Sequence, residues 1–193
     1  MSKIEEYLKY HSASTVNLFV RDKSKFLLKV AGLSDFNGNP STLRGNAVEN
    51  QLLTVPFYKH KNIEEHLDEA NKFYNEEVKK LNQEFDEKKI DKERQDIPNY
   101  IMSGFPIYYN LNDNPIKTQS KIVLEYEELS VPIIGYIDIE LENQIRDLKT
   151  TRAIPSVIPY ATQRQLAVYS TATKKDAWVD YVSKKNCTSH KVF

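Results

Sequence analysis

Hydrophobic and polar residues alternate over residues 136–141 of this chain, so every second side chain in this segment is apolar. This period is typical of a half-buried β-strand. Residues 145–150 have the composition of a second strand, and the pair Glu142-Asn143 between them favours a tight turn because asparagine tolerates a positive φ. The pattern therefore predicts an antiparallel hairpin in which Leu141 pairs with Gln144.

In this register, Asp138 lies directly opposite Asp147, and both carboxylates point to the same face of the sheet. Like charges in this position repel each other, so we expect a compensating positive charge nearby. Lys149 shares the face because side-chain direction repeats every second residue along a strand. The opposite face carries three apolar residues that we expect in the core: Ile137, Ile139 and Leu148.

Two carboxylates converging on a packed sheet suit a hard divalent cation, because Mg²⁺ commonly binds one or two carboxylates together with water and substrate phosphate. Lys149 is then placed beside the phosphate that is attacked. The alternative from the hairpin alone is that Asp138 and Asp147 are solvent-facing residues, with Lys149 as a surface ion-pair partner. The hairpin by itself leaves both interpretations open.

Apolar periodicity elsewhere predicts the elements around this hairpin. Ser12 or Ser14 can cap a first helix, and Pro56 is expected to end the third. Residues 35–41 are rich in Gly, Asn, Pro and Ser and predict a loop. The remaining expected elements are helices within 11–20 and over 23–31, 42–55 and 160–173, and strands over 121–129 and 176–183. Three antiparallel strands thus precede the helix at 160–173.

Residues 63–96 differ in character from the rest of the chain. Apolar residues recur there at steps of three and four, which predicts one long helix with a single apolar stripe. The segment has a net charge of −5, so the remainder of this formally neutral chain has a net charge of +5. A basic remainder suits contact with phosphates, whereas the acidic helix is not expected to lie along DNA. Residues 99–117 predict mainly loop or short helix.

The spacing of Asp138 and Asp147-Leu148-Lys149 resembles the PD-(D/E)xK nuclease superfamily, and specifically its RecB/Cas4-like branch, which includes many phage exonucleases. Two further motifs of that branch have counterparts here. Residues 44–49 are similar to its Arg-Gly-x-x-x-(His/Glu) element, and residues 165–169 are similar to its Gln-x-x-x-Tyr motif. The resemblance implies an α/β fold with a restriction-endonuclease-like core: a small mixed sheet whose catalytic hairpin is flanked by helices, within a single nuclease domain that carries the charged helical insertion.

The resemblance also implies roles for individual residues. Mg²⁺ or Mn²⁺ would be held by Glu49, Asp138, Asp147 and the carbonyl group of Leu148. Lys149 would stabilise or help to deprotonate the attacking water. The other residues implied at the site are Gln165 and Tyr169, which would help to orient the active site and substrate. Apart from the resemblance, Arg44, Arg152 and Arg164 are candidates for phosphate contacts. The single cysteine, Cys187, excludes a four-cysteine iron–sulfur cluster, so the chain resembles the cluster-free members of the branch.

The function expected from these motifs is metal-dependent DNA hydrolysis in phage or bacterial recombination, repair or DNA degradation. We expect an exonuclease that acts on DNA ends, because no helix-turn-helix or zinc finger is recognisable in the sequence. The first ten residues lack the apolar run of a signal peptide, so we expect the cytoplasm, that of a bacterial host if a phage encodes the chain. Besides DNA, a homo-oligomer or a recombination protein remains open as a partner.

A different class of function also remains open, namely a non-catalytic DNA-binding or assembly module on a nuclease fold, with the acidic helix as its interaction surface. The complete Asp/Asp/Lys set argues against this alternative. Ser-His-Asp hydrolysis is disfavoured because no histidine lies in a recognisable nucleophile context. The four histidines are His11, His60, His66 and His190.

Overall fold

The computed structural model describes residues 9–33, 38–81 and 85–193, which form an α/β fold around a mixed sheet. The strands are β1 (His11–Ser12), β2 (Pro115–Leu124), β3 (Ile133–Leu141), β4 (Gln144–Thr150), β5 (Asp176–Val182) and β6 (Cys187–Lys191). The helices are α2 (Ala13–Arg21), α3 (Lys23–Val30), α4 (Pro40–Leu52), α5 (Ile63–Lys79), α6 (Glu87–Tyr109) and α7 (Tyr160–Thr173).

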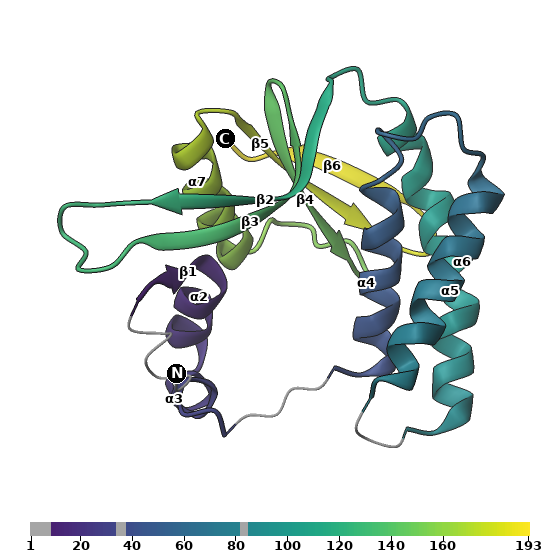
Figure 1. Cartoon of the computed structure of the whole chain (residues 1–193), viewed down its shortest axis with the longest axis horizontal. Coiled ribbons are helices and arrows are strands. Elements are labelled where there is room, and N and C mark those ends of the chain that lie inside the picture. The colour runs from purple at the N-terminus through teal and green to yellow at the C-terminus, as the bar shows by residue number, and fades with distance from the viewer. Residues whose placement is uncertain (1–8, 34–37, 82–84) are drawn as a thin grey trace.

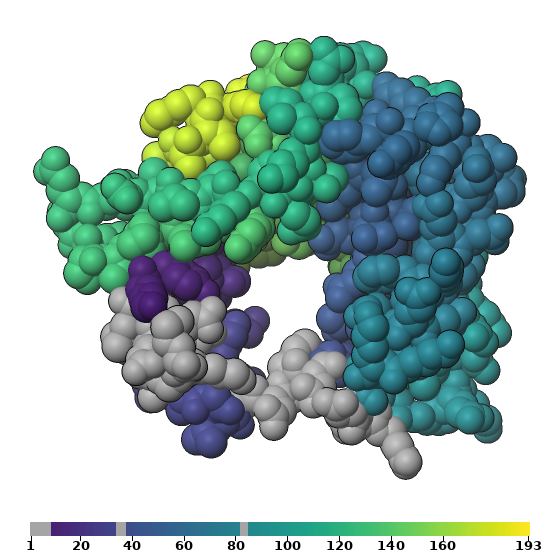
Figure 2. All heavy atoms as spheres, in the orientation of Figure 1, coloured from purple at the N-terminus to yellow at the C-terminus, as the bar shows by residue number. Residues whose placement is uncertain are grey.

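The sheet combines antiparallel and parallel pairs. Strands β2, β3 and β4 are antiparallel neighbours, β5 lies parallel to β4, and β6 is antiparallel to β5. Because β2 occupies one edge of β3, the other edge is shared by β1, which pairs at Ile133 and Ile134, and by β4, which pairs at Ile139 and Glu140. The far ends of β2 and β3 extend away from the body as a projecting ribbon (Figures 1 and 2).

Two hydrophobic clusters hold helices against the sheet. The larger joins α4, α5 and α6 to residues of β3, β4 and β5, and the smaller joins α7 to the sheet. Helix α4 lies between the sheet and the α5–α6 pair (Figure 1). None of the helices in the described ranges is long and apolar enough to span a membrane.

The predicted hairpin register is confirmed. Ile139 pairs with Arg146 and Glu140 pairs with Ile145, which are the pairs expected from a turn at residues 142–143. Asp138 and Asp147 are the next residues of β3 and β4 beyond the pair of Ile139 with Arg146. The three residues assigned to the core are nearly inaccessible: Ile137 is 1%, Ile139 0% and Leu148 2% exposed.

A buried polar network fastens β4 to β5 and α6. Arg146 donates two parallel hydrogen bonds to Asp180, from Nε to Oδ2 at 2.8 Å and from Nη2 to Oδ1 at 2.6 Å. Tyr108 of α6 donates a third, to Asp180 Oδ2 at 2.9 Å. Asp180 is fully buried, and these donors compensate its charge where water does not reach.

The single long helix expected over 63–96 is wrong, because α5 ends at Lys79 and α6 begins at Glu87. The two helices pack side by side, and Tyr74 of α5 donates a hydrogen bond to the Ile90 carbonyl group of α6 at 3.1 Å. The apolar stripe continues across the break because both helices bury their apolar residues in the same cluster.

The loop or short helix expected over 99–117 is also wrong over its first part, since α6 continues through Pro98 and Pro106 to Tyr109. A proline inside a helix removes a backbone hydrogen bond and crowds the preceding turn. Burial offsets that cost here, because the part of α6 between and beside the prolines carries buried core residues. These are Ile97, Tyr100, Ile101, Gly104 and Tyr108.

Other boundaries differ by a few residues. Ser12, not Ser14, caps α2, and α4 begins at Pro40, inside the expected loop, because Asn39 accepts hydrogen bonds from the first turn. The strand expected over 121–129 runs instead from 115 to 124, and the short strands β1 and β6 were not predicted. Residues 1–8, 35–37 of the expected loop and 82–84 of the expected long helix lie outside the described residues.

Candidate active site

The hairpin and two helices bring the predicted acids, lysine and amide together. Asp147 on β4 is 1% exposed, and its Oδ1 accepts hydrogen bonds from Lys149 Nζ and from Gln165 Nε2, both at 3.0 Å. Lys149 Nζ also lies 2.8 Å from Asp147 Oδ2. Gln165 Nε2 also donates to Tyr169 Oη at 3.1 Å. Tyr169, one turn further along α7, thus fixes the Gln165 amide that binds Asp147.

Asp138 on β3 is held by the backbone across the hairpin. Its Oδ2 accepts a hydrogen bond from the Leu148 N–H group at 2.8 Å. This contact ties the Asp138 side chain to the residue that follows Asp147 on β4. Glu49 on α4 lies near enough for its charge to raise the pKa of Asp138 and for the charge of Asp147 to raise the pKa of Glu49.

Two glycines allow the helices to approach the strands that carry these residues. A Cβ atom on Gly45 would lie 2.8 Å from Thr150 Oγ1, so α4 crosses β4 where a larger residue does not fit. A Cβ atom on Gly135 would collide with the Tyr169 ring, so this ring of α7 lies against β3 where a side chain does not fit. Both close approaches fix the helical residues of the site relative to the hairpin.

Burial and mutual repulsion perturb the three carboxylates. Burial raises the pKa of Asp138 well above its usual value, and the charges of Asp147 and Glu49 raise it further. Burial also raises the pKa of Glu49, against the opposing effect of Lys149. For Asp147, burial raises the pKa and the adjacent Lys149 lowers it. The site therefore holds more negative charge than one lysine compensates.

Lys149 keeps its proton at neutral pH. Burial alone lowers the pKa of Lys149. The charges of Asp147 and Asp138 outweigh this effect of burial, so the pKa lies above the usual value for lysine. Its side chain is 38% exposed, so the ammonium group reaches solvent beside the carboxylates. A protonated lysine in this position stabilises negative charge beside it.

The donor set fits a hard divalent cation. Glu49, Asp138 and Asp147 offer carboxylate oxygens, and the buried Oδ2 of Asp147 has the Lys149 ammonium group beside it at 2.8 Å. No three acidic, histidine or cysteine side chains within the described residues converge as a preformed metal cage. The carboxylates thus supply part of a coordination shell, as for Mg²⁺, which keeps several waters. The Leu148 carbonyl group stays a predicted ligand.

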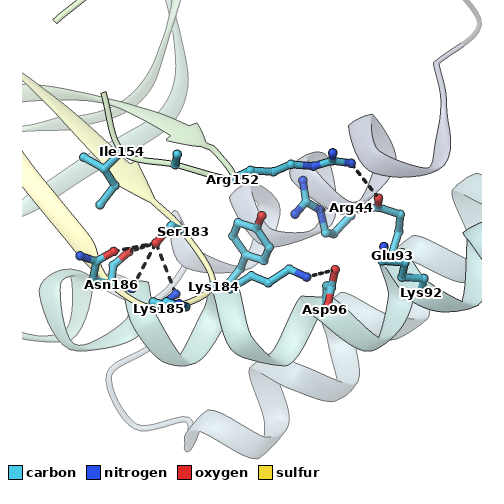
Figure 3. Close-up of a pocket in the computed structure, with 12 residues that line it drawn as sticks. Arg44, Lys92, Glu93, Asp96, Arg152, Ile154, Ser183, Lys184, Lys185 and Asn186 are labelled. Carbon is cyan, nitrogen blue, oxygen red and sulfur yellow. Dashed lines mark hydrogen bonds and ion pairs between the residues drawn. The ribbon is translucent and has the colours of Figure 1, made fainter. Parts of the chain in front are cut away.

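The three predicted arginines contact residues other than Glu49, Asp138 and Asp147. Arg44 is 6% exposed, its Nε is 3.2 Å from Glu93 Oε2, and its guanidinium group lies over the Tyr100 ring at 4.1 Å. Arg152 reaches the same glutamate, from Nη2 to Oε1 at 3.7 Å (Figure 3). Arg164 donates to a different residue, Asn17, at 2.9 Å.

Arg44 and Arg152 line a pocket of about 490 Å³ between α6, the segment after β4 and the turn between β5 and β6 (Figure 3). The pocket also carries Lys92, Lys184 and Lys185. Its two acids, Glu93 and Asp96, pair with Arg44, Arg152 and Lys184, so the lining has a net positive charge that is partly neutralised within the pocket. The roles of the three arginines in binding DNA stay predictions.

Gln119 is a site residue that the sequence pattern does not reveal. It lies in β2 between the pairs Thr118 with Ile139 and Ser120 with Ile137, so it falls opposite Asp138. Its backbone is in the left-handed region, with φ of 51°, and its Nε2 donates to Glu49 Oε1 at 3.4 Å. Glycine or asparagine usually signals this conformation, and glutamine gives no such signal.

No protein-family model matches the chain. No curated protein matches it either. Among solved structures, the crystal structure of SSO0001 is similar at a TM-score of 0.38 and 13% sequence identity, over 79% of this chain. This chain spans 64% of the length of that one. A TM-score of this size does not assign the chain to a fold family.

Proposed function

We propose that this chain is a metal-dependent nuclease that hydrolyses phosphodiester bonds in DNA. The observation that supports it most is the group of Glu49, Asp138 and Asp147, from three separate elements, around a protonated Lys149. Buried acids with raised pKa values are electrostatically unfavourable unless positive charge is added, and functional sites commonly have this property. A divalent cation supplies that charge.

In this mechanism, Glu49, Asp138, Asp147 and the Leu148 carbonyl group hold Mg²⁺ or Mn²⁺. When bound, the ion supplies Lewis-acid chemistry and lowers the pKa of a water molecule beside it. The chain itself orients the acids: the Leu148 N–H group fixes Asp138, and Gln165 fixes Asp147. Lys149 stabilises the negative charge that develops on the phosphate during attack.

We further propose that the substrate is a DNA end. Outside residues 63–96 the chain has a net charge of +5, which suits contacts to the phosphate backbone that carry no sequence information. The end-processing branch that the motifs resemble points the same way. Ordered contacts to a particular base sequence would require a recognition element that the sequence does not contain in recognisable form.

The test is digestion of labelled DNA with Mg²⁺, with Mn²⁺ and with EDTA. Linear duplex, linear single strands and covalently closed circles are compared at one salt concentration, because phosphate-driven binding falls steeply with salt. We expect metal-dependent loss of linear substrates only. Equal rates on closed circles would refute the requirement for ends, and no cleavage with either metal would favour the non-catalytic binding or assembly module.

A further inference from the structure

A second, smaller pocket opens beside Glu49 on the side of α4 that faces β2. Its volume is about 230 Å³. It is lined by α4, the segment that follows it, α5 and β2, through Asn46, Glu49, Asn50, Leu53, Thr54, Phe73, Thr118 and Gln119. Because Glu49 is both a proposed metal ligand and part of this wall, whatever occupies the pocket lies next to the reacting phosphate.

The lining chemistry excludes a phosphate as the occupant. No lysine or arginine lines the pocket, and its one charged side chain is the carboxylate of Glu49. Two asparagines, a glutamine and two threonines supply neutral hydrogen-bonding groups, and Leu53 and Phe73 supply apolar surface. A nucleobase matches this combination because it has apolar faces and an edge of neutral donors and acceptors.

Gln119 connects the pocket to the metal site. Its side chain lines the pocket and donates to Glu49 Oε1. Its left-handed backbone lies within a strand that continues in the same register on both sides, opposite Asp138. Non-glycine residues adopt this conformation at a cost, and such residues cluster at functional sites.

We propose that this pocket binds the base of a nucleotide adjacent to the cleaved linkage, and that Gln119 is a positioning residue that couples this base to Glu49. The inference rests on the proposed nuclease function, since it names part of the substrate of the same site. Base binding then selects where along the strand the phosphate meets the carboxylates. The amides would contact one edge of the base, and Leu53 and Phe73 would contact one of its apolar faces. Such contacts favour some bases over others without strict sequence recognition.

The test measures binding of short single-stranded DNA to the full chain in Ca²⁺, which takes the same oxygen ligands as Mg²⁺. The probes are a set of oligonucleotides in which one abasic nucleotide is moved stepwise inward from the end. For the unmodified chain, we expect affinity to fall about tenfold at one position of the abasic nucleotide, equivalent to about 1.4 kcal/mol.

Two variants separate the pocket from general DNA binding. Asn46→Ala and Gln119→Gly each remove an amide from the pocket, and we expect the loss at the sensitive position to shrink to about threefold, because less of the base contact remains to be lost. Asn99→Ala is the matched control, since Asn99 is an exposed asparagine on helix α6, outside the pocket. It should retain the full tenfold loss.

The outcomes distinguish this inference from the proposed function. Equal affinity for every abasic probe, or a full tenfold loss in both pocket variants, would overturn the base pocket even if the protein cleaves DNA. A position-dependent loss that the pocket variants reduce supports the pocket even if cleavage with Mg²⁺ and Mn²⁺ is absent. For Gln119→Gly, a higher KM for intact DNA with unchanged kcat would refute the coupling to Glu49.

Discussion

Replacing Gly45 by alanine adds a single Cβ atom at the point where α4 crosses β4. The new Cβ atom would meet Thr150 Oγ1 at 2.8 Å, so the two elements must separate by at least about 0.6 Å to reach ordinary contact. Overpacking of this kind costs about 1–3 kcal/mol. Alanine in place of glycine within a helix returns about 1 kcal/mol, so the net loss of stability is at most about 2 kcal/mol.

The effect on cleavage should be larger than the effect on stability. Glu49 lies one turn beyond Gly45 on the same face of α4, so a displacement of the helix moves this carboxylate relative to Asp138 and Asp147. Misplacement of a reacting group by about 1 Å can reduce turnover about 100-fold. We therefore expect Gly45→Ala to fold, melt slightly below the unmodified chain and lose most of its cleavage rate.

A double variant supplies the control. Within the described part of the chain, Thr150 Oγ1 is the only heavy atom within 4 Å of the new Cβ atom outside the helix backbone and the adjacent residues, so Thr150→Ala removes the clash. Gly45→Ala in that background should restore cleavage and melt about 2–4 °C above Thr150→Ala alone. Thermal melting and single-turnover cleavage measure the two effects. A Gly45→Ala chain that gains stability and cleaves normally would refute the close packing of α4 on β4.

Three other variants test separate parts of the structure. Lys149→Ala should abolish cleavage but retain metal binding in calorimetry, because the lysine acts on charge and is not a ligand; loss of binding would make it part of the metal site. Asp180→Asn should cost about 3–5 kcal/mol in denaturant unfolding, because Arg146 would remain buried without its carboxylate; a cost under about 1 kcal/mol would contradict this. The hydrogen bond from Lys175 lowers the pKa of Glu140 in the folded chain. The ionised carboxylate therefore stabilises the fold at pH values above the usual pKa of glutamate, and this stabilisation is lost as the pH falls through the lowered pKa. Glu140→Gln should thus cost less than about 1 kcal/mol at neutral pH, and the difference should vanish in acid; a difference that persists there would have another cause.

The parts of the fold that the sequence predicted are those set by local pattern. Alternation of apolar residues and a two-residue turn determine the hairpin register, because a slip by one residue would turn the core residues to the other face. The bounds of α7 follow from a proline before its first residue and an apolar stripe that faces the sheet. The meeting of Asp138, Asp147, Lys149 and Gln165 depends on these two elements and was predicted with them.

The parts that were not predicted depend on contacts distant in sequence. Pro98 and Pro106 argue locally against a helix, and only the burial of α6 against α4, α5 and the sheet explains why it continues through them. The left-handed backbone of Gln119 likewise has no local cause in its side chain. The charge of Arg44 makes it a candidate for a phosphate contact, but nothing in its own segment indicates that it is buried beside Glu93.

The α5–α6 pair resembles a detachable insertion when only its charges are considered, but its inner surface is part of the main hydrophobic cluster. The buried residues that it contributes there are Ala70, Tyr74, Ile97, Tyr100, Ile101 and Tyr108. These side chains support α4 from the side opposite the sheet, and α4 carries Glu49. A chain engineered without the pair would therefore expose the back of α4 and loosen a proposed metal ligand. Substitutions in this buried surface can alter catalysis from a distance, whereas the charged outer surface is free to vary.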